Sequence, residues 1–230
     1  HVYLVGSGTS YHACVTASYM FNKLAYLPST PVVAGSFVEL YGSSLRKDDT
    51  YILVSQSGET KDVINALNHL EKQGVKKILG IVNVIGSTLQ RRALKHLPLL
   101  SNLEISVPAT KTFLNQVIIF LYLGYLISKR KNLEISVAEG DFFELPSLIE
   151  KSVEVGERYT KELVNDLENL KDLYCLGYGI THGIALEGAL KIKEVTYIHC
   201  EGMYSSEFKH GPLSIVEKNY PVIFVTTIED

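Results

Sequence analysis

Residues 51–60, YILVSQSGET, decide the fold of this chain. The first four are aliphatic, β-branched or aromatic, which is typical of a buried strand. Three hydroxyls, one amide and one glycine follow, and residues 61–74 then carry apolar side chains at the spacing of one helical face. A strand that runs into such a turn at a helix N-terminus can hold an anion, because backbone N–H groups and a dipole charge of roughly +0.5 point at it. Taken alone, the turn fits an anion site and a plain helix cap at Ser57 equally well.

Strand patterns and helix patterns alternate through residues 1–132. This alternation predicts an α/β fold, a three-layer αβα sandwich whose parallel sheet is covered by helices on both faces. Four of the expected elements are a helix at 11–27 with Thr9 or Ser10 as its cap, strands at 97–101 and 103–106, and a helix at 112–130.

An internal repeat divides the chain. Shifted by 171 residues, VYLVGSGTSYHA at 2–13 lies over LYCLGYGITHGI at 173–184. We therefore expect a complete unit at 1–132, a second, incomplete unit at 171–230, and between them a polar linker followed by a charged helix at 150–170. Because the chain begins at His1 without Met and its second unit stops early, we expect it to be a fragment of a longer protein.

The charge, hydropathy and cysteine content of the chain indicate which kinds of partner and which cellular compartment to expect. The net charge of −3 and the pI near 6.2 indicate neither a nucleic-acid partner nor a membrane surface. The apolar run at 117–127 is too short to span a bilayer and is expected to be a buried helix. Cys14, Cys175 and Cys200 have neither pairing nor metal-ligand spacing, so we expect a reducing, cytoplasmic compartment and no metal site.

Hydroxyl-rich turns follow several strands of the first unit. Because the carboxyl ends of parallel strands share one edge of a sheet, these turns are expected to converge there. A pocket of hydroxyls and backbone N–H groups suits a phosphorylated sugar, whose phosphate carries about −1.5 to −2 charge and three acceptor oxygens. The residues expected to line it are Thr9, Ser10, Ser55, Gln56, Ser57 and Thr60.

A helix expected at 184–199 in the second unit carries Glu187, Lys191 and Glu194 on one face. Helix periodicity alone favours a solvated ladder of ion pairs. The alternative is a carboxylate base with a lysine that neutralises developing enolate charge. Downstream, the rigid turn His210-Gly211-Pro212 could direct an imidazole into a cleft, although a lone histidine in a turn is more often structural or exposed.

The motifs SGTSYHA, SQSGETKDV, ATKTF, LEGALKIKE and EFKHGPL occur in this order and span nearly the whole chain. Together they resemble the sugar-isomerase (SIS) domain family, and within it the isomerase part of the glutamine–fructose-6-phosphate aminotransferases. The resemblance implies that Glu194 moves the proton between C1 and C2 with Lys191 near it. It also implies that Val107 and Ala109 touch the sugar, and that His210 opens the sugar ring from a neighbouring subunit of a homodimer.

The expected function is therefore to convert fructose 6-phosphate and ammonia into glucosamine 6-phosphate, with no metal or organic cofactor, because no motif for one is present. Two alternatives stay open: a stand-alone SIS isomerase or glucosamine-6-phosphate deaminase, and a non-enzymatic module that binds phosphosugars in a regulator.

Three departures from the family matter. Ala109-Thr110-Lys111 stands where the family has Ser-Thr-Lys, so one hydroxyl is missing. The family's N-terminal glutaminase domain, and the C-terminal tail that supplies a Schiff-base lysine, are absent. Alone, this chain is expected neither to release ammonia from glutamine nor to form that imine, and the parent chain is expected to carry a glutaminase domain.

Overall fold

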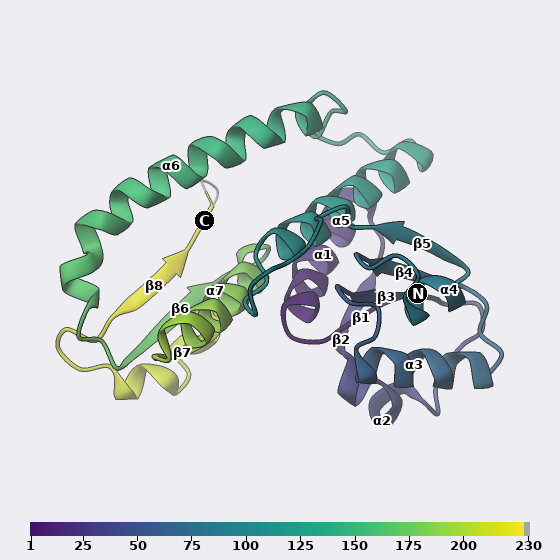
Figure 1. Ribbon diagram of the computed structural model, residues 1–230, viewed down its shortest axis with the longest axis horizontal. Helices are drawn as coiled ribbons and strands as arrows, with labels where there is room; N and C mark the ends of the chain where they lie inside the picture. The colour runs from purple at the N-terminus through teal and green to yellow at the C-terminus, as the bar shows by residue number, and fades with distance from the viewer. Residues whose placement is uncertain (228–230) are drawn as a thin grey trace.

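The computed structural model describes residues 1–227, apart from the side chains of residues 165 and 166. Within them the chain forms two parallel sheets with helices between and around them, as predicted (Figure 1). The first sheet has the order β2-β1-β3-β4-β5. Its strands are β1 (Val2–Gly6), β2 (Ser29–Val33), β3 (Thr50–Ser55), β4 (Ile78–Val82) and β5 (Lys95–Pro98). The helical elements of this unit are α1 (Thr9–Ala25), η1 (Ala34–Ser36), α2 (Phe37–Tyr41), α3 (Lys61–Lys72), α4 (Thr88–Arg92) and α5 (Lys111–Arg130).

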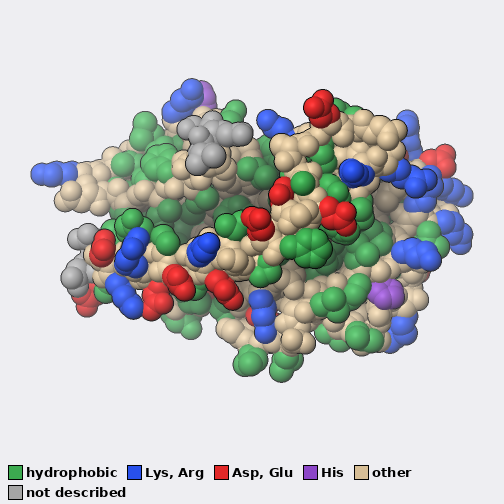
Figure 2. Space-filling view, turned by 90° about the horizontal axis from the view of Figure 1, so that it is seen from above, with side chains coloured by type: hydrophobic (Ala, Val, Ile, Leu, Met, Phe, Trp, Pro, Cys, Tyr) green, Lys and Arg blue, Asp and Glu red, His purple; other side chains and the backbone are tan. Residues whose placement is uncertain are grey.

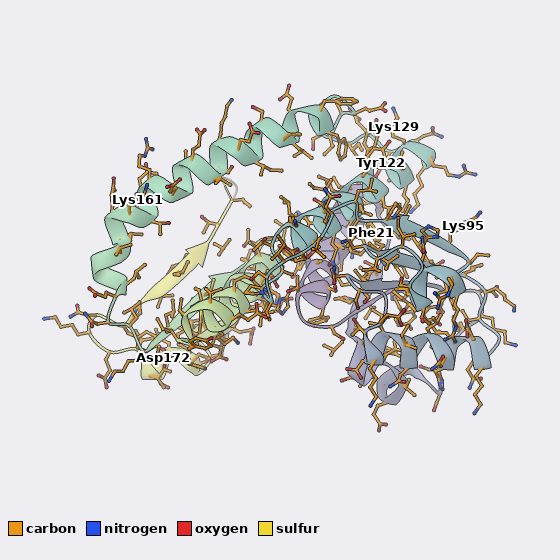
Figure 3. All side chains as sticks on the ribbon, in the orientation of Figure 1. Phe21, Lys95, Tyr122, Lys129, Lys161 and Asp172 are labelled. Carbon is orange, nitrogen blue, oxygen red and sulfur yellow. The ribbon has the colours of Figure 1, made fainter. Side chains whose placement is uncertain are left out.

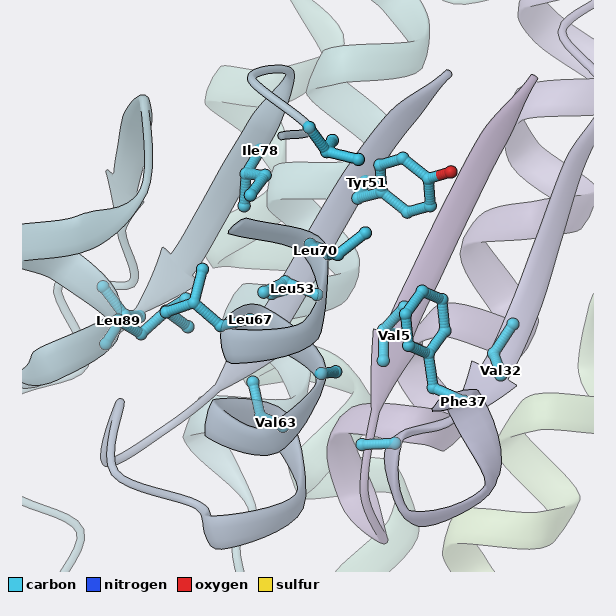
Figure 4. Close-up of a cluster of buried hydrophobic side chains, with 14 residues drawn as sticks. Val5, Val32, Phe37, Tyr51, Leu53, Val63, Leu67, Leu70, Ile78 and Leu89 are labelled. Atoms are coloured by element: carbon cyan, nitrogen blue, oxygen red, sulfur yellow. The ribbon is translucent and has the colours of Figure 1, made fainter. Parts of the chain in front are cut away.

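Alternate residues of the first sheet face opposite cores, which explains the continuous apolar pattern of β3. Tyr51 and Leu53 pack toward α3, whose Leu67 and Leu70 are fully buried (Figure 4). Ile52 and Val54 pack on the other face, beneath α1 and α5. The two cores make this unit a three-layer αβα sandwich, as expected from the sequence.

Helix α5 covers the sheet beside α1. The ring of Phe21 on α1, labelled in Figure 3, meets the ring of Phe120 on α5 edge to face, with the ring centroids 5.8 Å apart. By length and hydropathy α5 is, among the described residues, the one helix that could cross a membrane, a test that buried core helices also pass. It runs well beyond the apolar stretch at 117–127 on which the sequence prediction of a buried helix was based.

The second unit repeats the first. Its sheet has the order β7-β6-β8, so β6 lies between β7 and β8 as β1 lies between β2 and β3. Both α1 and the second unit's first helix end in a left-handed residue, Tyr26 and Tyr197, and these two positions are again 171 residues apart. The repeat found in the sequence is therefore a repeat of β-α-β structure. Its elements are β6 (Asp172–Gly177), α7 (Thr181–Thr196), β7 (His199–Tyr204), α8 (Ser205–Phe208), η2 (Pro212–Ile215) and β8 (Val222–Val225).

Several predicted boundaries were wrong. Helix α1 begins at Thr9 behind Gly8, with no side-chain cap, because the Thr9 hydroxyl bonds to a distant residue instead. Strand β5 begins at Lys95, and the strand predicted at 103–106 is an irregular loop. The connecting helix α6 (Asp141–Leu167) starts earlier than the charged helix expected at 150–170, and it includes Pro146.

Helix α6 arches between the two units with most of its side chains exposed (Figure 1). Charge is divided unevenly along the chain. Lys and Arg outnumber Asp and Glu by about two to one in residues 1–132, and the ratio is reversed in the rest. Figure 2 shows the basic side chains gathered over the end that holds the first sheet. The small net charge therefore hides a strongly dipolar molecule.

Helices α1 and α7 hold the units together by close contact at Gly183. A Cβ at this position would overlap the Thr16 hydroxyl and lie 2.7 Å from the His12 carbonyl oxygen. We expect Gly183→Ala to lower the free energy of unfolding by about 1–3 kcal/mol, the usual cost of overpacking. Urea unfolding measures it. Gly188→Ala on the same helix is the matched control, because its Cβ would make an ordinary 3.5 Å contact with the Cys175 sulfur. Equal stability of the two variants would contradict the close contact.

Candidate functional site

The first sheet reverses its winding between β1 and β3. These strands are neighbours, with Val5 paired to Leu53, but the chain leaves β1 toward β2 on one side and continues from β3 toward β4 on the other. In open α/β sheets, ligands bind in the crevice at the carboxyl ends of the strands at such a point. Thr9 follows β1 and residues 55–60 follow β3, so the two predicted segments lie at this edge together.

The loop after β3 is tightly organised by its own hydroxyls. The Ser55 Oγ accepts a hydrogen bond from the Gly58 N–H at 2.9 Å and lies 2.8 Å from the Thr60 Oγ1. The Ser57 Oγ accepts from the Glu59 N–H at 3.1 Å. Helix α3 begins after Thr60 with no side-chain cap, so Ser57 is not the helix cap that the sequence left possible. The first turn of α3 keeps N–H groups that can meet an anion.

The turn before α4 supports this loop from the side. Gly58 has φ +67°, and a Cβ there would overlap the Ser87 side chain. The Glu59 carboxylate accepts a 2.6 Å hydrogen bond from the Thr88 N–H, and this bond lowers the pKa of Glu59. The Ser87 Oγ is buried without a hydrogen-bond partner. Sequence reasoning placed Ser87 in a turn at this edge but did not select it as a site residue.

A polar network joins the first unit to α7. Glu187 is only 5% exposed, and its carboxylate accepts a 2.9 Å hydrogen bond from the Thr9 hydroxyl. The His12 Nδ1 lies 2.8 Å from the other carboxylate oxygen. The Lys191 Nζ lies 3.3 Å from Glu187 and 2.5 Å from Glu194. The three charged residues of α7 are therefore not the solvated ladder that periodicity favoured, because Glu187 is buried against the first unit.

The remaining predicted residues have separate positions. The Ser10 hydroxyl is buried and accepts a hydrogen bond from the Gln116 amide on α5 at 3.1 Å, so it faces the helix contact. Ala109 is partly exposed, and Val107 is 91% exposed on the loop between β5 and α5. The backbone carbonyl of Gln56 accepts hydrogen bonds from Asn83 and Val84. None of these observations tests contact with a sugar, so these assignments stay predictions.

His210 is exposed after α8, where its backbone N–H donates to the Glu207 carbonyl. Among the described residues, no hydrogen bond or ion pair joins its imidazole to Glu194 or Lys191. The fold of one chain thus brings Thr9, Lys191 and Glu194 together but does not bring His210 to them.

The cysteines and the possible metal ligands were located in the described part of the chain. Cys14, Cys175 and Cys200 are buried and unpaired, and burial raises the pKa of the Cys200 thiol to about 11. No group of three or more His, Cys, Asp and Glu side chains among the described residues is arranged to hold a metal ion.

Comparison with known proteins identifies the family. The model of the SIS domain matches residues 1–124 and 166–230. The chain belongs to the SIS domain family. Its two matched segments correspond to the two units of the repeat, which α6 separates in the structure.

The curated relatives of this SIS chain include glutamine–fructose-6-phosphate aminotransferases. That of Pyrobaculum aerophilum is 38% identical over 225 residues, and that of Pyrococcus horikoshii is 35% identical over 222. These matches cover 98% and 96% of this chain but 37% of each relative, so the chain spans well under half of their length.

Among solved structures, the C-terminal domain of glucosamine-fructose-6-phosphate aminotransferase from Francisella tularensis matches 97% of this chain and 63% of that domain. Its TM-score is 0.85 at 30% identity. The glucosamine-6-phosphate deaminase from Thermotoga maritima matches 97% of this chain and 66% of its own, with TM-score 0.83 and 26% identity. The SIS part of the aminotransferases is thus similar to this chain in both sequence and structure.

Proposed function

We propose that this chain is the sugar-phosphate isomerase part of a glutamine–fructose-6-phosphate aminotransferase, which forms glucosamine 6-phosphate for hexosamine biosynthesis. The observation that supports the proposal is the Lys191–Glu194 ion pair, whose lysine also contacts Thr9. Thr9 follows β1, and β1 pairs with β3, the strand that leads into the hydroxyl-rich loop. A sensor of phosphosugars needs the phosphate loop but has no use for a carboxylate–ammonium pair next to it. This pair therefore favours an enzyme over a regulatory module.

Each part of the site has a chemical task in this proposal. The loop with Ser55, Ser57 and Thr60 binds the phosphate through hydroxyls and N–H groups. Glu194 removes a proton from C1 and returns it at C2, because a carboxylate over a planar enediol or enolamine can reach both carbons. Lys191 stabilises the negative charge that develops on the neighbouring oxygen. His210, from the partner subunit, exchanges the protons needed to open the sugar ring.

The domain limits, the oligomeric state and the compartment are part of the same proposal. Unit limits of 1–132 and 171–230, with a connector at 133–170, follow the repeat. The parent is proposed to form a homodimer, and its additional length to include a glutaminase domain, since this chain spans 37% of its aminotransferase relatives. Three buried, unpaired cysteines support a reducing compartment, the cytoplasm.

The second candidate is a glucosamine-6-phosphate deaminase or stand-alone isomerase, which the deaminase of similar structure supports. It would use the same residues for the reverse proton transfer. The first residues of the parent protein distinguish the two candidates, because a glutaminase domain begins with a cysteine directly after the initiator methionine.

Fructose 6-phosphate is expected to raise the melting temperature of the protein through the loop after β3. A ligand at 100 times its Kd stabilises by about 2.7 kcal/mol, which corresponds to roughly 5–10 °C for a chain of this size. We expect Ser55→Ala with Ser57→Ala to abolish the shift, measured by thermal denaturation.

The matched control is Ser43→Ala with Ser147→Ala, two exposed serines outside the loop. This control is expected to keep the full shift. A double variant at Ser55 and Ser57 that responds to fructose 6-phosphate like the parent would show that the phosphate is bound elsewhere.

A further inference from the structure

Glu187 is a buried carboxylate with three donors from two units of the fold. The Thr9 hydroxyl and the Lys191 ammonium meet its Oε1 at 2.9 and 3.3 Å, and the His12 Nδ1 meets its Oε2 at 2.8 Å. The side chain of His12 is 14% exposed and that of Glu187 is 6% exposed, so solvent screens the pair weakly. A buried carboxylate in this position is stable only with such partners.

The protons of the network can be assigned from its acceptors. An ionised carboxylate only accepts hydrogen bonds, so His12 must carry a proton on Nδ1 and donate it. The Thr9 hydroxyl donates its single proton to Glu187, and its oxygen then accepts from Lys191 at 3.3 Å. Each donor is used once toward Glu187, and no acceptor in the network competes for the Nδ1 proton of His12.

This arrangement controls the position of Lys191. Its ammonium lies between two carboxylates, 3.3 Å from Glu187 and 2.5 Å from Glu194. If Glu187 were free to rotate, both of its oxygens could approach Lys191 and draw it away from Glu194. We propose that His12 is a positioning residue, which holds Glu187 by one oxygen and thereby keeps Lys191 beside Glu194. The proposal rests on the function proposed above and adds to it a residue from the first unit that acts on the catalytic helix of the second.

Packing alone does not account for this contact. Helices α1 and α7 already meet at Gly183, and a further inter-unit hydrogen bond, outside the Glu187 network, joins the Tyr19 and Tyr204 hydroxyls at 3.2 Å. The other histidine at this interface, His182, stacks on Tyr204 with ring centroids 3.3 Å apart. Only His12, of the two histidines, is bonded to a residue that also holds Lys191.

Kinetics of the full-length parent protein test the proposal. His12→Ala is expected to lower kcat by roughly 10–100-fold, the cost of displacing a catalytic group by about 1 Å. The KM for fructose 6-phosphate should change by less than about twofold, because the phosphate loop is a separate part of the site. His12→Asn should restore most of kcat, since an amide N–H can take the place of the Nδ1 proton.

Tyr19→Phe is the matched control. It removes an inter-unit hydrogen bond that lies outside the Glu187 network and should leave kcat and KM at parental values. The proposal is overturned if His12→Ala keeps the parental kcat. It is also overturned if His12→Asn, His12→Ala and Tyr19→Phe all lower kcat by the same factor. Interface packing would then explain the loss of kcat.

A second measurement does not depend on activity. Solid-state NMR of the full-length protein with ¹⁵N-labelled histidine reports which ring nitrogen of His12 carries the proton. The His12 signal is assigned by its disappearance from the spectrum of the His12→Asn variant. We expect Nδ1 to be protonated, and Glu187→Gln to change the Nδ1 signal. An unprotonated Nδ1 in the parent would overturn the proposal. If the parent fails to turn over sugar phosphates while Nδ1 is protonated as expected, the proposed function fails and the His12–Glu187 contact stands.

Discussion

Glu194→Gln is expected to lower kcat for glucosamine 6-phosphate formation by about 10²–10⁴-fold, the range for loss of a positioned acid–base group. The amide has nearly the shape of the carboxylate but cannot accept a proton at neutral pH. KM should change little, because the hydroxyls that bind the phosphate lie on another loop. The full-length protein is assayed with fructose 6-phosphate and glutamine, and solvent deuterium incorporation at C1 and C2 is measured in parallel.

Glu201→Gln is the control for the loss of one negative charge from the second unit. Glu201 lies exposed on β7 and is not one of the two carboxylates paired with Lys191, so its substitution should leave kcat unchanged. If Glu194→Gln continues to exchange deuterium into the sugar at the parental rate, another group moves the proton. The role assigned to Glu194 would then be wrong.

The sequence predicted most of the fold because local patterns and tertiary packing agree in this chain. The strand at 51–54 is apolar on both faces because it lies in the middle of a parallel sheet, buried from both sides. The spacing of 171 residues holds from β1 and β6 through the left-handed ends of α1 and α7. Repetition of a whole β-α-β unit is therefore visible at the level of single residues.

Errors arose where a distant contact replaced the local preference. Thr9 is a good helix cap in isolation, yet its hydroxyl bonds to Glu187, which is 178 residues away. Residues 103–106 have a strand-like composition, but the Lys111 ammonium donates to the Leu103 carbonyl and holds the segment as a loop. Glu187 lies outside any local window around Thr9. The Lys111–Leu103 bond is local but runs from a side chain to the backbone, which strand propensity does not take into account.

The candidate site was predicted in parts. Helical spacing correctly put Glu187, Lys191 and Glu194 on one face, but it could not show that Glu187 is buried against the other unit. The hydroxyl-rich loop was found because its hydroxyls and their hydrogen-bond partners are close in sequence. His12 was missed because only the tertiary fold gives it a carboxylate partner.

Two inactive variants are expected to restore activity when they are combined in one dimer. His210→Ala and Glu194→Gln should each be inactive alone. If His210 reaches the site of the neighbouring subunit, a mixed dimer has one site with both changes and one site with neither. Random reassembly of equal amounts of the two variants should therefore recover about a quarter of the parental activity, by the two-fold symmetry of the dimer.

The structure favours this outcome for two reasons. His210 is exposed and, within the described residues, is not joined to Glu194 or Lys191 of its own chain. The first unit is basic and the remainder acidic, so a dimer in which each first unit faces the partner's second unit is electrostatically favourable.

Combining Glu194→Gln with Lys191→Ala is the matched control for this complementation. Both changes lie on the same helix, so every site in a mixed dimer carries one defect and activity should stay absent. Recovery in this control would mean that Lys191 and Glu194 of one chain serve different active sites, which would contradict their assignment to a single site. Failure of the His210→Ala mixture to recover, with mixed dimers verified by two affinity tags, would place all catalytic groups within a single chain.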